Sequence, residues 1–207
     1  SVTKISQKQM VEEISQICSF ISTEKIAKKL SEHPEWISKK FNAFEKKYLT
    51  IAQDGKKHEE FEIMTNKILR IFGFNVQTKV KVTFTDEQEG EIDTLVTYNS
   101  ESGVIDEKAG KNFSCGNERV GPMEDYIKEA RKISDATKVK FFGYVYGKKF
   151  STPGGFNRIC KEMKIDGFRI SAANLLSCLD AFNNNKITPK QIWKLFQKNG
   201  EITSLDY

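Results

Sequence analysis

The sequence lacks any apolar run long enough to cross a membrane, which takes about 20 residues in a helix. Its opening stretch, SVTKISQKQMVEE, also lacks the apolar core of a secretory signal. An initiator Met is missing, so we expect either a processed chain or an excised part of a longer protein. Internal repeats and low-complexity tracts are absent too, which excludes repeat architectures and a disordered tail.

Cysteine and histidine are few and scattered. The only histidines are His33 and His58, and no two cysteines form a CxxC pair. The four cysteines lie far apart in the chain, at Cys18, Cys115, Cys160 and Cys178. This pattern argues against a zinc site, whose Cys and His ligands are closely spaced. We expect reduced structural thiols in a cytoplasmic protein.

The composition is typical of a soluble globular protein of one or two domains. Its 207 residues are 38% hydrophobic and 29% charged. The 33 Lys and Arg exceed the 28 Asp and Glu, and the resulting net charge of +5 favours polyanionic partners. A solvated surface of mixed charge gives the same balance, so charge alone leaves both interpretations open.

Two parts of different character follow each other along the chain. The first fifty residues have helical periodicity, as in the apolar face from Ile14 to Ile21, and Pro34 suits the first turn of a further helix. This segment fits a small helical bundle and a winged-helix remnant equally well. The Gln53-Asp-Gly-Lys-Lys break then predicts a boundary near residue 52, which divides the chain into segments 1–52 and 53–207.

The second part alternates strands with helices. The stripe Phe61, Met64, Ile68 and Phe72 predicts a helix that ends at Gly73. Alternation of period two predicts strands at 74–84, 92–98 and 103–109, the last two joined by a turn at Asn99-Ser-Glu-Ser. Further on we expect helix 118–133, strand 139–147, a loop at STPGG, helix 156–163, strand 167–171, helix 172–182 and a last helix after Thr188-Pro189. This order indicates an α/β fold in which helices flank a central mixed β-sheet, with a helical N-terminal segment.

Charged side chains stand out on two neighbouring predicted strands. Side chains alternate along a strand, so Asp106 and Lys108 face one way and Glu107 the other. If the two strands pair as a hairpin, Asp93 lies beside Asp106. Two such carboxylates can hold a hard divalent ion that polarises a phosphate and activates water, and a lysine can orient that water. A solvated strand face gives the same triplet, so spacing alone does not decide between the two interpretations.

Asp93 followed by Asp106-Glu107-Lys108 resembles the PD-(D/E)xK nuclease motif, in which an acidic residue on one strand precedes (D/E)xK on the next. The segment from Phe61 to Phe74 is similar to the phenylalanine–glutamate helix that precedes this motif in many members. Glu62 matches the glutamate of that helix, which would reach the same metal site.

Residues 55–207 are most similar to the FokI-like cleavage domain of type IIS restriction endonucleases. They share a Gly-Val-Ile strand that runs into Asp-x-Lys-Ala, a helix bearing Tyr126, an aromatic strand and a closing Ile187-Thr-Pro. Two positions depart from the pattern. Ile92 stands where the motif has Pro, and Glu107 is the x of DxK, where the backbone carbonyl rather than the side chain is expected to touch the metal.

The resemblance implies a restriction-endonuclease-like fold and a Mg²⁺-dependent DNA endonuclease in a prokaryotic cytoplasm, either the cleavage domain or a subunit of a type IIS enzyme. Asp93, Asp106 and the Glu107 carbonyl would hold Mg²⁺, for which Mn²⁺ would substitute. Glu62 would bind the ion directly or through water, and Lys108 would position the nucleophile. Such a domain has little sequence selectivity, so a separate domain or subunit would recognise the double-stranded DNA. Cutting both strands implies a transient homodimer or heterodimer.

Other interpretations stay open at this stage. Basic residues after the motif are candidates for DNA contacts, although a solvated helix face gives the same pattern: Lys111, Arg119, Lys128 and Arg131. Within the same class, a structure-selective resolvase or a modification-dependent nuclease shares this core. The alternative from another class is a non-catalytic DNA-binding or assembly module, which would have no need of buried Asp and Lys side chains.

Overall fold

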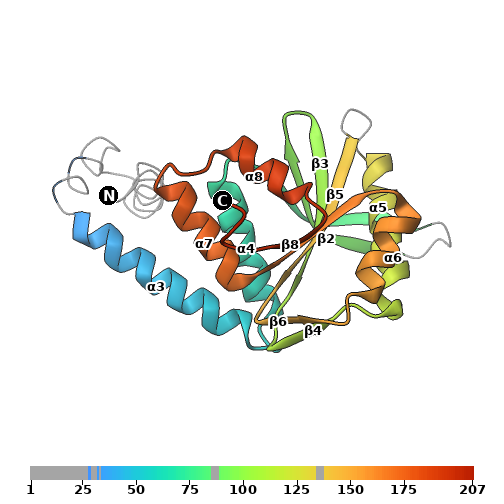
Figure 1. Cartoon of the computed structure of the whole chain (residues 1–207), viewed down its shortest axis with the longest axis horizontal. Coiled ribbons are helices and arrows are strands. Elements are labelled where there is room, and N and C mark those ends of the chain that lie inside the picture. Colours follow the sequence, from blue (N-terminus) through green and yellow to red (C-terminus); the bar gives the residue numbers. More distant parts are fainter. Residues whose placement is uncertain (1–27, 29–31, 33, 85–88, 134–137) are drawn as a thin grey trace.

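The computed structural model describes residues 28, 32, 34–84, 89–133 and 138–207 (Figure 1). Its centre is a six-stranded sheet in the order β1-β2-β3-β5-β7-β8. The strands are β1 (Asn75–Thr83), β2 (Glu89–Tyr98), β3 (Glu101–Lys108), β5 (Lys138–Tyr146), β7 (Asp166–Ser171) and β8 (Gly200–Ile202). The first three pair antiparallel, whereas β3, β5, β7 and β8 run parallel. The predicted α/β fold with a central mixed sheet is confirmed.

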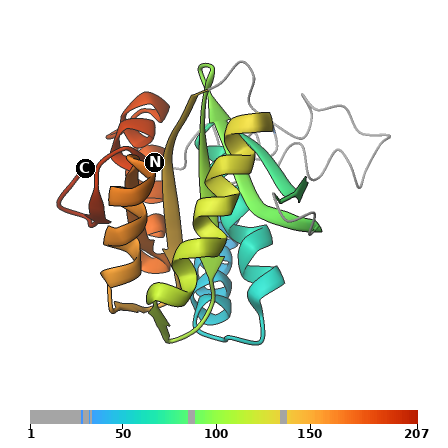
Figure 2. The ribbon, with the colours of Figure 1, turned by 90° about the vertical axis from the view of Figure 1, so that its right-hand side faces the viewer.

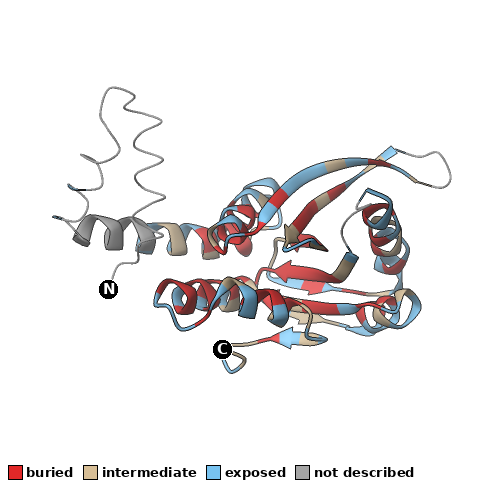
Figure 3. Ribbon diagram, turned by 90° about the horizontal axis from the view of Figure 1, so that it is seen from above, coloured by how far each residue is buried: buried red, intermediate tan, exposed pale blue. Residues whose placement is uncertain are grey.

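Helices cover both faces of this sheet (Figures 1 and 2). One face carries α3 (Pro34–Ala52), α4 (His58–Ile71), α7 (Ala172–Asn183) and α8 (Pro189–Phe196). The other face carries η1 (Asn117–Arg119), α5 (Val120–Ile133) and α6 (Gly154–Met163). Each face therefore has its own hydrophobic core, and Figure 3 shows buried residues along the strands between the two helical layers. Burial of apolar surface on both faces explains why β3 and β5 are almost entirely buried.

Local sequence explains where two of the helices end or begin. The predicted apolar stripe of α4 is buried, and the chain leaves this helix at Gly73, whose φ of 88° is a conformation that glycine adopts without strain. Helix α8 begins with a capping box. Thr188 Oγ1 accepts a hydrogen bond from the Gln191 backbone N–H, and Gln191 Oε1 accepts one from the Thr188 backbone N–H.

The hairpin of β2 and β3 turns at Asn99 and Ser100, whose φ angles are 48° and 62°. Positive φ at both turn residues matches the right-handed twist of the flanking strands. The turn is shorter than the predicted four residues, because β3 begins at Glu101. The hairpin pairs Thr94 with Ile105, and this register brings the acidic residues of the two strands together.

Three short strands differ from the sequence-based expectation. These are β4 (Asn112–Ser114), β6 (Lys149–Ser151) and β8, of which β4 and β6 pair in a small parallel sheet of their own. In addition, α6 begins at Gly154, within the STPGG segment that was expected to be a loop. A strand of three residues is too short to have a recognisable period of two, so its formation depends on the neighbour with which it pairs.

The end of α3 packs into the same core as the sheet. Tyr48, Ile51 and Ala52 are buried, and the Tyr48 hydroxyl shares a hydrogen bond with Thr65 Oγ1 at 2.8 Å. The domain boundary expected near residue 52 stays a prediction. The helical face from Ile14 to Ile21 lies outside the described residues. In the part of the chain that the structure describes, no helix is long and apolar enough to cross a membrane.

Candidate active site

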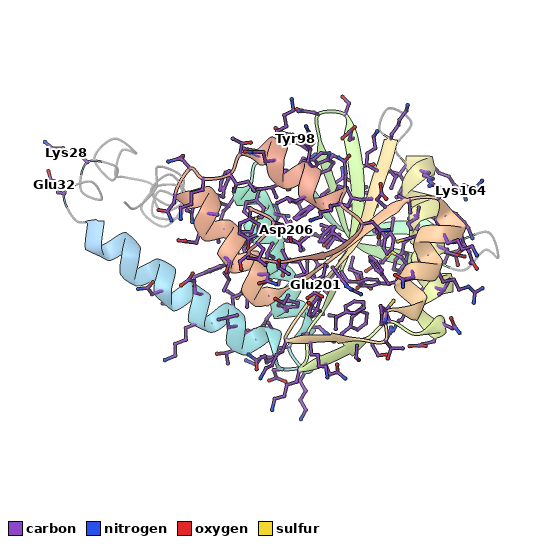
Figure 4. The ribbon with its side chains drawn as sticks, in the orientation of Figure 1. Lys28, Glu32, Tyr98, Lys164, Glu201 and Asp206 are labelled. Carbon is purple, nitrogen blue, oxygen red and sulfur yellow. The ribbon has the colours of Figure 1, made fainter. Side chains whose placement is uncertain are left out.

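Asp93 and Asp106 lie side by side on the antiparallel strands β2 and β3. Thr94 pairs with Ile105, so Asp93, which precedes Thr94, lies across from Asp106, which follows Ile105. The two carboxyl groups are close enough to interact electrostatically. They lie toward the end of β3 that is remote from Tyr98, which pairs with the first residue of that strand (Figure 4). The hairpin expected from the sequence therefore brings both carboxyl groups together.

Asp106 is buried, with 6% of its surface exposed. Burial raises its pKa, the neighbouring Lys108 ammonium opposes this, and Asp93 adds to the rise, so the pKa lies at about 7 instead of 3.8. The Lys108 ammonium contacts Asp106 Oδ1, yet this buried oxygen makes no hydrogen bond of good geometry. Negative charge at Asp106 is therefore only partly compensated by the protein.

Lys108 stays protonated at neutral pH. Burial lowers the pKa of its ammonium, but Asp106 and then Asp93 raise it more, and the net pKa is above the ordinary value. An ammonium with a raised pKa cannot accept a proton near pH 7. Lys108 can therefore orient a water molecule or stabilise negative charge, but it cannot act as a general base.

Glu62, on the first turns of α4, is half-buried near the two aspartates. Burial and then the charge of Asp93 raise its pKa, while His58, Lys79 and Lys108 lower it. Its carboxylate therefore lies within electrostatic reach of the aspartate pair. Nevertheless, among the residues that the structure describes, no three His, Cys, Asp or Glu side chains converge closely enough to hold a metal ion by themselves.

Glu107 points to the opposite side of β3, as strand alternation predicts. Its carboxyl oxygens accept hydrogen bonds from Thr94 Oγ1 at 3.0 and 3.2 Å, and that hydroxyl also lies 3.0 Å from Asn66 Oδ1 on α4. Burial, and then the charge of Asp106, raises the pKa of Glu107 well above its ordinary value. The Glu107 side chain is thus a buried acid that links β2, β3 and α4.

Two further residues, Lys79 and Tyr126, lie near the site, and of these the family resemblance pointed only to Tyr126. Lys79 on β1 has a φ of 51° and falls between the pairs Thr78–Thr94 and Val80–Ile92, which places it opposite Asp93. Left-handed backbone at a residue other than glycine costs about 1–3 kcal/mol. Tyr126 on α5 is half-buried, and burial followed by Asp93 and Asp106 raises the pKa of its hydroxyl. Neither placement can be read from local periodicity.

The four candidates for DNA contacts divide into two pairs. Lys111 and Arg119 are exposed, and the charge of Arg119 reaches Lys108. In contrast, Lys128 pairs with Asp125 at 3.0 Å, and Arg131 donates a hydrogen bond to the Met163 carbonyl at 3.2 Å. Both of these α5 side chains already have protein partners.

The donors at the site fit a small hard cation. Mg²⁺ commonly takes one or two carboxylates and fills its remaining positions with water and substrate phosphate. Asp93 and Asp106 supply two adjacent carboxylates, and the buried Asp106 Oδ1 lacks a hydrogen bond. The absence of a third converging acidic side chain is compatible with this cation, whereas a cage made only of side chains would require it.

Comparisons with known proteins identify the family and the fold of the chain. The chain matches the family of the FokI cleavage domain over residues 21–203. It also resembles the structure of restriction endonuclease FokI and that of FokI bound to DNA, each with a TM-score of 0.62 and 14% identity over 95% of this chain. The chain spans about a third of those two proteins, 34% and 33%. No curated protein matches it in sequence. Because the family match extends through both strands of the aspartate pair and nearly the whole described fold, the chain belongs to the FokI cleavage-domain family.

Proposed function

We propose that this nuclease domain of restriction-enzyme type is a Mg²⁺-dependent endonuclease that hydrolyses phosphodiester bonds of double-stranded DNA, as the cleavage domain or a subunit of a type IIS enzyme. The observation that carries the proposal is the grouping of Asp93, Asp106 and Lys108 at one end of the β2–β3 hairpin. Membership of the FokI cleavage-domain family supports it.

Each residue has a distinct role in this proposal. Asp93, Asp106 and the Glu107 backbone carbonyl would hold Mg²⁺, or Mn²⁺ in its place, and Glu62 would bind it directly or through water. When bound, such an ion polarises the phosphate and lowers the pKa of water. The Lys108 ammonium orients the attacking water and stabilises the charge that develops on phosphate oxygens.

Asp106 is buried, so its carboxylate interacts with nearby charges more strongly than it would in water. Attack by water on phosphorus forms one P–O bond while the bond to the leaving sugar oxygen breaks. The products are one phosphate-ended and one hydroxyl-ended strand.

The residues of the chain indicate which steps it would perform itself and which steps would need a second copy or a separate domain. One aspartate pair cleaves one strand, so we propose that a double-strand cut needs two copies that pair transiently. Sequence recognition would belong to a separate domain or subunit, because no helix in the described part of the chain combines basic residues with the Asn, Gln and Arg spacing of a major-groove reader.

Plasmid cleavage with different divalent ions tests this function. Nicking is expected with Mg²⁺ and Mn²⁺ and is expected to be lost in EDTA. Ca²⁺ should support binding but not cleavage, because its looser coordination neutralises the carboxylates without placing water in line. Gel-shift binding in parallel separates these two steps. Equal cleavage in EDTA would remove the divalent ion from the mechanism.

A further inference from the structure

Three segments of the chain meet just beyond the end of β3. The Gly110 N–H donates to the Ala52 carbonyl at 2.8 Å, and the Gly147 N–H donates to the Lys108 carbonyl at 3.1 Å. A Cβ added at Gly147 would overlap the carbonyl oxygens of Ala52 and Gly110, so only glycine allows this close approach. The end of α3, the β3–β4 connection and the β5–β6 connection are therefore fixed against one another next to Lys108.

Among the exposed lysines of these segments we select five, which we call the junction lysines: Lys46, Lys56, Lys111, Lys148 and Lys149. Within the described ranges of the chain, no carboxylate lies at ion-pair distance from any of their ammonium groups. The nearby acid Asp54 is engaged locally, because its Oδ1 accepts the Lys56 backbone N–H at 3.0 Å. Positive side chains therefore outnumber negative ones here, although Asp54 also lines this surface.

A groove of about 640 Å³ separates two of the junction lysines. The groove is lined by residues from the end of α3, from the segment that follows it, and by Lys111: Lys46, Leu49, Thr50, Gln53, Asp54, Gly55 and Lys111. The lining contains no aromatic side chain, which a site for single-stranded nucleic acid uses to stack bases. It also contains no arginine, the residue that most often reads guanine in the major groove. A lining with lysines but without aromatic or arginine side chains is better suited to bind the regularly spaced phosphates of a duplex than to bind exposed bases.

We propose that the junction lysines bind the phosphate backbone of duplex DNA beyond the cleaved bond and so hold the duplex against the aspartate pair. This inference deepens the proposed function and rests on it for the identity of the ligand. Binding would be independent of sequence, since lysine contacts to phosphate carry no sequence information. It would depend steeply on salt, because each neutralised phosphate releases counterions.

The test compares two triple variants of the full chain. Lys111→Gln/Lys148→Gln/Lys149→Gln removes three charges from the junction. Lys186→Gln/Lys190→Gln/Lys194→Gln removes three exposed charges at or near α8, none of which pairs with an acid among the described residues. Helix α8 is joined to the other end of β3 by a 2.7 Å hydrogen bond from Trp193 to Glu101. Fluorescence anisotropy with a labelled duplex in EDTA gives the affinity at a series of salt concentrations without cleavage. Circular dichroism melting checks that both variants fold.

We expect the junction variant to bind at least about tenfold more weakly at low salt, with a log–log salt slope reduced by about 2.7, or about 0.9 for each lost phosphate contact. The α8 variant should retain the wild-type slope. Equal slopes for the two variants, or failure of the wild-type chain to bind the duplex, would overturn the inference. So would loss of affinity by the junction variant for duplex RNA but not for DNA.

Plasmid nicking in Mg²⁺, measured with the same preparations, keeps this result separate from the proposed function. If the wild-type chain nicks DNA while both triple variants bind alike, the function stands and the junction inference falls. If the junction variant shows the expected reduction in the salt slope of binding, but the wild-type chain does not cleave DNA with any divalent ion, the inference stands and the proposed function falls.

Discussion

At the scale of single residues, Asp106 shows most clearly how burial and neighbouring charges determine the electrostatics of the site. Water cannot solvate its carboxylate, and Lys108 compensates only part of the buried charge, so its pKa rises to about 7. A bound divalent cation would instead favour the ionised form of Asp106, because the ion would be the largest charge near this carboxylate. Asp106, whose buried charge destabilises the folded protein, is therefore the residue expected to hold the ion.

We expect Asp106→Asn to change how stability depends on pH in EDTA. A carboxyl with a raised folded-state pKa stabilises the fold fully below about pH 3.8, and this contribution is lost as the pH rises through about 7. The wild-type chain should therefore lose stability relative to Asp106→Asn over this range, by up to about 4 kcal/mol at about 1.4 kcal/mol per pKa unit. Urea unfolding at several pH values measures the difference. Parallel curves for the two proteins would contradict the burial argument.

At the scale of elements, the β2–β3 hairpin is held to α4 by a buried polar network. Thr94 on β2 donates to Glu107 on β3, and Asn66 of α4 lies within hydrogen-bond distance of the same hydroxyl. The network lies on the face of β3 opposite to Asp106 and Lys108. It therefore sets the position of the strand that carries them without contacting the reacting phosphate.

We expect Thr94→Val to destabilise the protein by about 1–3 kcal/mol, because it leaves the buried Glu107 carboxyl without its hydroxyl partner. Thr94→Ser keeps the hydroxyl and serves as the matched control, with a smaller loss from the missing methyl group. Chemical denaturation of the three proteins gives the comparison. If Thr94→Val were as stable as Thr94→Ser, the network would have no role in holding the hairpin to α4.

Helices and strands are predicted well from the sequence where a local pattern marks them. They are predicted poorly where they form only by pairing with a distant segment of the chain. The alternation in 92–98 and 103–109 and the turn at Asn99 are enough to predict the hairpin, and with it the meeting of Asp93 and Asp106. The three-residue strands have no such signal, because each forms only against a neighbour supplied by the rest of the fold. The same holds for Lys79, whose place opposite Asp93 comes from the irregular pairing of β1 with β2.

At the scale of the whole molecule, the chain has one aspartate pair within a fold that spans a third of restriction endonuclease FokI. A single site can cut one strand in one event. Converting a nick into a double-strand break therefore needs either a second event near the first or a second copy of the chain.

We expect double-strand cleavage to rise faster than linearly with protein concentration. If two copies pair on the duplex, the initial rate of linear plasmid formation should follow about the second power of concentration, while nicking follows about the first. Counting nicked and linear plasmid over a dilution series separates the two. A linear product that forms in strict proportion to protein concentration would indicate that one copy cuts both strands.

The most direct test of the nuclease assignment is the nicking rate of Lys108→Ala in Mg²⁺, measured beside the wild-type chain. Lys190→Ala is the control, since it removes the same charge from an exposed position on α8. We expect Lys108→Ala to lose about 100-fold or more of the nicking rate, because it removes the positive charge beside the reacting phosphate, and Lys190→Ala to match wild type. A folded Lys108→Ala protein that nicks DNA at the wild-type rate would contradict the assignment.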